Sequence, residues 1–130
     1  MKRAISLIQK HCDSDETLLC YQGEAQVEEE ENCTRFHVSM NTPAGEVEVR
    51  AFAQAAAIDS RFEQHTHLLL REGHQTYARV EGSFGTLTLP VKTESYKKTP
   101  DFVYVRYALM QDRRACDTFE LRIEMGGGMK

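Results

Sequence analysis

Two histidines are the residues of this sequence whose spacing comes nearest to a reactive site. His65 and His67 stand two positions apart, so on a β-strand both imidazoles would lie on the same face. Two imidazoles on one face can hold a metal ion, and His74, beyond the turn at Gly73, could supply a third ligand. The sequence identifies no carboxylate partner, and solvent-facing polar residues leading into an apolar strand are the alternative interpretation. We expect no metal and no cofactor; His65 and His67 are the candidate ligands if a metal binds.

A nucleophilic enzyme would need a serine or cysteine beside a base. The sequence contains no Gly-x-Ser-x-Gly motif and no Cys-x-x-Cys pair. We expect reduced and mostly buried thiols, with Cys20 packed on the same face as Leu18. We therefore predict no catalytic residues, and a small metal-dependent enzyme is the least favoured function. The cysteines concerned are Cys12, Cys20, Cys33 and Cys116.

Arginines and tyrosines within apolar segments indicate a binding site instead. An arginine buried inside a barrel needs partners, because an unpaired buried charge is costly. Beside tyrosine hydroxyls it would suit a carboxylate or phosphate group, whereas the alternative is an outward side chain with its stem packed on the surface. Arg106 and Tyr107 are neighbours, so only one of them can face a barrel interior. The candidate pocket residues are Tyr77, Arg79, Arg106 and Tyr107.

These residues lie in segments whose apolar and polar side chains alternate with a period of two. Residues 118–125 place four apolar side chains on one face, and residues 35–40, 46–50 and 85–91 follow the same pattern. Half-buried strands of this kind are typical of antiparallel sheets. Residues 102–110 are apolar on both faces and rich in β-branched and aromatic residues, which also favours a strand.

Turn-forming residues recur at short intervals between these segments, for example at 13–15, 28–32, 41–45 and 97–101. About eight to ten strands at this spacing predict an all-β fold. We expect a single antiparallel calycin- or lipocalin-like β-barrel, with a β-sandwich as the alternative.

One segment departs from this pattern. Residues 52–62 have an alanine-rich centre that favours a helix by propensity, although a connection or a distorted strand would also fit. No repeat or domain boundary is visible. We expect one domain over residues 1–125 and a flexible glycine-rich tail over residues 126–130.

The net charge and the hydropathy of the chain limit the classes of partner that it can bind. The chain carries 16 basic and 20 acidic residues, a formal net charge of −4. It lacks the positive charge that attracts proteins to nucleic-acid phosphates or to anionic membrane surfaces. No apolar run approaches the roughly 20 residues that span a bilayer, and no export signal is recognisable. We expect a cytoplasmic protein with neither nucleic acid nor membrane as a partner.

A longer pattern runs through residues 66–125. It comprises Arg71-Glu-Gly73, residues 77–85, the Leu-x-Leu strand within residues 86–93, Tyr107-Ala-Leu109 and the final alternating strand at 119–125. This pattern resembles the YwiB-like proteins, a bacterial family of uncharacterised small barrels. The resemblance implies a closed calycin-type barrel, similar in shape to lipocalins and fatty-acid-binding proteins. It implies no activity.

The sequence therefore leaves the function unknown and allows two main hypotheses. In the first, the barrel binds a small amphipathic or anionic ligand. In the second, the barrel is filled and acts as a protein-interaction module or a homodimer, which the doubly apolar segment 102–110 favours.

Overall fold

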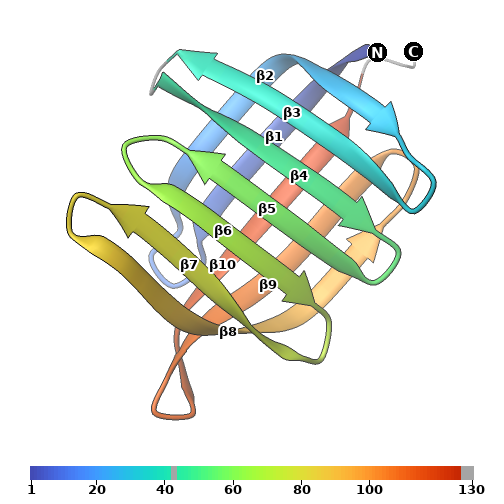
Figure 1. Ribbon diagram of the computed structural model, residues 1–130. Helices are drawn as coiled ribbons and strands as arrows, with labels where there is room; N and C mark the ends of the chain where they lie inside the picture. Colours follow the sequence, from blue (N-terminus) through green and yellow to red (C-terminus); the bar gives the residue numbers. More distant parts are fainter. Residues whose placement is uncertain (42–43, 127–130) are drawn as a thin grey trace.

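The computed structural model describes residues 1–41 and 44–126, and ten β-strands run through them (Figure 1). All pair antiparallel in one closed barrel of order β1-β10-β9-β8-β7-β6-β5-β4-β3-β2. The predicted all-β barrel is confirmed, and the sandwich alternative is wrong. Within those residues no helix is long and apolar enough to cross a membrane. The strands are β1 (Lys2–His11), β2 (Glu16–Glu29), β3 (Cys33–Asn41), β4 (Ala44–Phe52), β5 (Ala55–Arg61), β6 (His65–Arg71), β7 (Gln75–Gly82), β8 (Gly85–Lys98), β9 (Phe102–Gln111) and β10 (Arg114–Met125).

The alanine-rich segment forms strand β5 and not a helix. Ile58 pairs with Val49 on β4 and with Leu68 on β6, so both edges of β5 are occupied. Ile58 and Ala56 face inward and are buried. Helix propensity is a weak preference, and pairing on both sides outweighs it here. The predicted turn at 41–45 and the predicted tail at 126–130 include residues 42–43 and 127–130, which lie outside the described residues.

Alternate side chains from all ten strands fill the barrel interior with apolar groups. Each large aliphatic side chain buried in this way contributes about 1.5–3 kcal/mol through removal from water. Thr93 is an exception, because its fully buried hydroxyl has no hydrogen-bond partner among the described residues. The largest fully buried apolar side chains are Leu7, Phe36, Val38, Val47, Val49, Leu70, Val91, Val103, Val105, Leu121 and Ile123.

The two ends of the barrel differ. At the end that holds the chain termini, the buried Tyr96 on β8 donates a hydrogen bond of 2.5 Å from its hydroxyl to the Phe52 carbonyl on β4. This bond ties together two strands that are not neighbours in the sheet. At the opposite end, the β1–β2 and β5–β6 turns surround more polar inward positions, such as Gln9 and Thr66, which are only partly buried. A side-chain hydrogen bond therefore crosses the first end, whereas the inward positions at the second end are more polar.

The alternation along β6 can be tested with two adjacent leucines. Leu70 is fully buried and Leu69 is 54% exposed on the outer face. We expect Leu70→Ala to lower the free energy of unfolding by about 2–5 kcal/mol, because it leaves a cavity in the barrel. Leu69→Ala should change it by no more than about 0.5 kcal/mol. Urea denaturation measures both values, and equal losses would contradict the orientation of β6.

Candidate functional site

A cleft of about 480 Å³ opens at the end of the barrel opposite the chain termini. One wall comes from β1 and β2, and the other from β5, β6 and the turn between them. These two pairs of strands are not neighbours in the sheet, so the cleft spans the barrel mouth. Its volume falls in the range of about 300–1,000 Å³ that is usual for small-molecule sites. The lining residues are Gln9, Leu18, Leu19, Ser60, Phe62, Glu63, Gln64, Thr66 and Leu68.

The lining of this mouth cleft is amphipathic. Its apolar surface comes from three leucines and Phe62, and Leu18 is 46% exposed at the rim. Its polar groups are two amides and two hydroxyls, which are neutral and can both donate and accept hydrogen bonds. Glu63 is the single charged residue in the lining. The cleft therefore offers hydrophobic contact, neutral hydrogen-bonding groups and one negative charge.

Tyr107 lies inside the barrel and supports the cleft through Gln9. The Gln9 amide donates a hydrogen bond of 2.8 Å to the Tyr107 hydroxyl, and the Tyr107 ring stacks on Phe119 at 5.5 Å between centroids. Tyr107 is only 3% exposed, and this burial raises the pKa of its hydroxyl to about 12. Tyr107 is thus a neutral hydroxyl at physiological pH and holds Gln9 in place.

Arg106 and its surroundings lie on the outer face of β9. The guanidinium contacts Glu94 at 3.1 Å and Glu120 at 3.3 Å, and the Tyr104 hydroxyl donates to Glu120 at 2.7 Å. Burial and this hydrogen bond raise the pKa of Tyr104. Polar pairs therefore cross the outer face of a strand that the sequence marked as apolar on both sides. That the outer face of β9 is a contact surface for a second copy of the chain stays a prediction.

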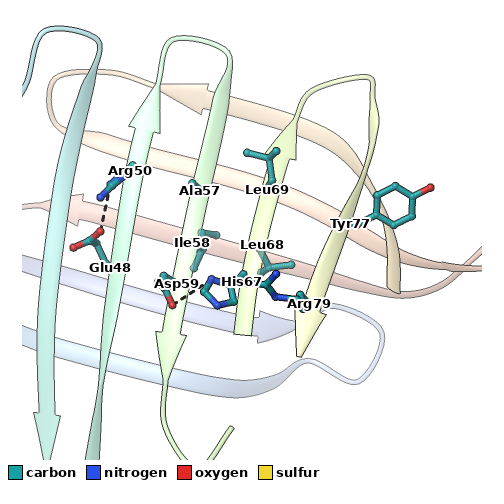
Figure 2. A pocket seen from close by; sticks show the side chains of 10 residues that line it. All are labelled: Glu48, Arg50, Ala57, Ile58, Asp59, His67, Leu68, Leu69, Tyr77 and Arg79. Atoms are coloured by element: carbon teal, nitrogen blue, oxygen red, sulfur yellow. Dashed lines mark ion pairs between the residues drawn. The ribbon is translucent and has the colours of Figure 1, made fainter. Parts of the chain in front are cut away.

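Tyr77 and Arg79 lie on a different outer surface, a groove of about 400 Å³ across β4 to β7 (Figure 2). Tyr77 is 58% exposed, and Figure 2 shows its ring pointing away from the sheet. Both arginines of this groove are paired, Arg50 with Glu48 at 3.3 Å and Arg79 with Glu81 at 3.6 Å. They are therefore not free cations waiting for an anion.

The structure does not bring the four predicted pocket residues together. Tyr107 faces the interior, while Arg106, Tyr77 and Arg79 face outward on β9 and β7. Alternation requires the opposite orientations of Arg106 and Tyr107. Ligand contact by any of the four stays a prediction. The mouth cleft was missed because its residues come from two distant hairpins, which only closure of the barrel places opposite each other.

His65 and His67 share the outer face of β6, as their spacing predicts, and their rings are 4.0 Å apart between centroids. Two carboxylates join them. Asp59 on β5 pairs in register with His67, and Glu81 on β7 pairs with His65. These partners could not be identified from the sequence, because they depend on the register of neighbouring strands. One nitrogen from each ring and one Asp59 oxygen lie within 4.8 Å of one another, and His74 is not in this group.

All four cysteines are free thiols, as the sequence predicts. Their predicted burial holds only in part: Cys33 is buried, whereas Cys20 and Cys116 are exposed. The prediction for Cys20 is wrong because β2 turns the face that carries it toward solvent. Burial raises the pKa of the Cys12 and Cys33 thiols, which disfavours their reactive thiolate forms.

Comparison with known proteins identifies the fold. No protein-family model matches the sequence, and no curated protein matches it. Among solved structures, the chain is similar to the crystal structure of ywiB protein from Bacillus subtilis, with a TM-score of 0.61 and 12% sequence identity. The match covers 96% of this chain and 90% of that chain. At this identity the likeness shows a shared YwiB-like fold.

The buried Tyr107 hydroxyl predicts a loss of stability in alkali. The pKa of about 12 in the folded state lies above the ordinary value of 10.0. Below about pH 10 both states hold the proton and this contribution is fully present; it is lost as the pH rises toward 12, because the unfolded chain ionises first. At about 1.36 kcal/mol for each unit of pKa difference, the total loss approaches about 2.7 kcal/mol.

Urea denaturation at about pH 8 and about pH 11 measures this loss. Tyr107→Phe should lose less stability between the two pH values than the unmodified protein. Tyr77→Phe, at an exposed position, should lose as much as the unmodified protein. If Tyr107→Phe and the unmodified protein lose the same amount, Tyr107 is not the buried neutral group described here.

Proposed function

We propose that this protein is a small-molecule binding protein of the YwiB-like, calycin-type barrel class, and that its ligand is amphipathic and occupies the mouth cleft. The observation that supports this proposal is the cleft of about 480 Å³ at the end of the barrel opposite the chain termini, whose lining is amphipathic. Barrel mouths are a common position for ligand sites. The free thiols fit a reducing compartment, so we propose a cytoplasmic location as well.

The charge of the lining favours a neutral or cationic polar group on the ligand. Glu63 is the only charged residue of the cleft, and it would repel a carboxylate or phosphate. The arginines that could neutralise an anion, Arg79 and Arg106, lie outside the barrel and are paired with glutamates. The anionic ligand considered from the sequence is therefore the less favoured of the two classes.

The apolar part of the ligand would pack against Leu19, Phe62 and Leu68, which already contact the barrel core or form part of it. Each buried methylene contributes about 0.8 kcal/mol, so a chain of about eight carbons gains about 6 kcal/mol. Association costs at least about 4 kcal/mol in lost freedom. Hydrogen bonds from Gln9 or Gln64 to the polar group are therefore needed to give useful affinity.

Three amphiphiles with eight-carbon chains, counting the carboxyl carbon of octanoate, test both the site and the preferred charge. Isothermal titration calorimetry with octyl glucoside, octyltrimethylammonium and octanoate, each below its micelle concentration, measures affinity for neutral, cationic and anionic groups. We expect the neutral or cationic probe to bind about tenfold or more tightly than octanoate, the factor that corresponds to 1.4 kcal/mol. Preference for octanoate would contradict the assignment of charge.

Two leucine variants locate the binding. Leu18→Glu places a charge on the apolar rim of the cleft, and we expect it to weaken binding of the neutral probe about tenfold or more. Leu69→Glu is the matched control, because Leu69 is similarly exposed but lies on the outer face of β6. It should leave the affinity unchanged. Equal effects of the two substitutions, or no binding of any probe, would overturn the proposal.

A further inference from the structure

The outer face of β5, β6 and β7 carries a cluster of donor atoms that the mouth cleft does not use. We propose that this cluster, formed by Asp59, His65 and His67 with Glu81 behind them, binds a divalent transition-metal ion, and that the ion is Zn²⁺. The three ligating groups are each about one third exposed, at 31%, 30% and 33% for their side chains. They are accessible from solvent and fixed on paired strands.

Both imidazole rings lie between the same two carboxylates. On one side, the Asp59 Oδ1 atom is 2.5 Å from His65 Nε2 and 3.7 Å from His67 Nδ1. On the other side, the Glu81 Oε1 atom is 3.5 Å from His65 Nδ1 and 3.9 Å from His67 Nε2. Each ring therefore turns one nitrogen toward Asp59 and the other toward Glu81.

This arrangement assigns a role to each nitrogen. A neutral imidazole has one N–H group and one lone pair. Without a metal, His65 Nε2 and Asp59 Oδ1 share a proton in a hydrogen bond of 2.5 Å. When a cation displaces that proton and each ring keeps its N–H on the side of Glu81, two nitrogen lone pairs and one Asp59 oxygen converge on the same point. Histidines that bind metals commonly donate their other N–H to a carboxylate, which fixes the tautomer and the ring orientation. Glu81 is placed to be that carboxylate for both rings.

Two arginines occupy the remaining carboxylate oxygens. Arg61 lies 3.9 Å from Asp59 Oδ2, and Arg79 lies 3.6 Å from Glu81 Oε2. Neither ion pair involves the oxygen that faces the histidines. The arginines thus hold each carboxylate with one oxygen directed toward the rings, although their positive charge also lowers the affinity for a cation. We expect a binding constant well below that of structural zinc sites.

The donor set suits Zn²⁺ better than Ca²⁺ or Mg²⁺, which prefer sites made only of oxygen atoms. Zinc ligands lie about 2.0–2.2 Å from the ion, so tetrahedral donor atoms are about 3.3 Å apart. The two Asp59 contacts, 2.5 Å and 3.7 Å, bracket that separation. Small rotations of the partly exposed side chains would therefore bring the donors to coordination distance.

A second group, His11 with Asp13 and Asp117, has similar composition but is a weaker candidate. It contains one histidine, and its atoms already serve local hydrogen bonds. Asp13 Oδ2 accepts the Thr118 backbone N–H at 3.1 Å, and both nitrogens of His11 have partners at 2.8 Å in Ser14 and Asp117. These bonds stabilise the turns at the barrel end, and they explain why the three side chains lie close together without a bound ion.

Titration of tag-free protein with zinc chloride in a non-chelating buffer tests the proposal by calorimetry. We expect one Zn²⁺ per chain. His65→Gln and His67→Gln should each weaken binding about tenfold or more, and Glu81→Gln should weaken it by about 10–100-fold, as loss of a supporting carboxylate does elsewhere. Thermal melting without metal checks that each variant folds, and one that does not fold is replaced by Asp59→Asn.

Matched controls separate this cluster from other donors in the chain. His37 is also an outward strand histidine paired with a carboxylate, Glu46 at 2.6 Å, but it has no second histidine beside it. His37→Gln, His11→Gln and the double change of the exposed thiols, Cys20→Ser with Cys116→Ser, should leave zinc affinity within about twofold.

Cobalt substitution gives a second readout. Co²⁺ in the site should show the strong visible absorption of a four-coordinate ion, and His67→Gln should abolish it. Undiminished zinc binding in folded His65→Gln and His67→Gln proteins, or no zinc binding by the unmodified protein, would overturn the proposal. Neither result would bear on the mouth cleft, because the two sites share no polar side chain.

Discussion

Closure of the sheet between β1 and β10 is the constraint on which the remaining structure depends. The first and last strands pair from Ile5 with Met125 to His11 with Phe119, so the sheet has no free edge. Every strand then has an inner and an outer face, and a register shift of one residue would exchange them. The fully buried positions Leu7, Val105 and Ile123 keep that register, because a shift would move apolar side chains into water.

Closure also makes the two ends of the barrel unequal. Phe36, Leu121 and their neighbours fill the middle of the interior, and Tyr96 donates a hydrogen bond to the Phe52 carbonyl across the end with the chain termini. Toward the other end the inward residues become smaller or polar, as at Ser60 and Thr66, and the cleft opens between two hairpins. A barrel of this size thus combines a packed core, which stabilises the fold, with a cleft that it can offer to a ligand.

The outer face of the barrel carries charged side chains, whereas the interior is filled by apolar ones. Several of the charges on the outer face form ion pairs, either between neighbouring strands, as with Arg106 and Glu94, or along one strand, as with Arg50 and Glu48. Exposed ion pairs contribute little stability, typically below about 1 kcal/mol each. An arginine in such a pair already has a carboxylate partner and is less available to an anion. The exception is the pair of adjacent imidazoles on β6, where two carboxylates converge on nitrogen atoms and not only on arginines.

The strand-rich fold and the face on which many side chains lie could both be predicted from the amino-acid sequence. Alternation at residues 118–125 and 35–40 depends only on a period of two, so it could be read directly. The same rule placed His65 beside His67 and set Arg106 opposite Tyr107. Helix propensity was misleading for residues 52–62, where pairing on both sides outweighs it, and alternation did not show that the face of Cys20 turns outward. Tertiary structure alone decided which strands are neighbours and in which register. Asp59 and Glu81 therefore join the histidines, and Gln9 comes to face Thr66 across the mouth, because contacts between distant segments exist only once the sheet has closed.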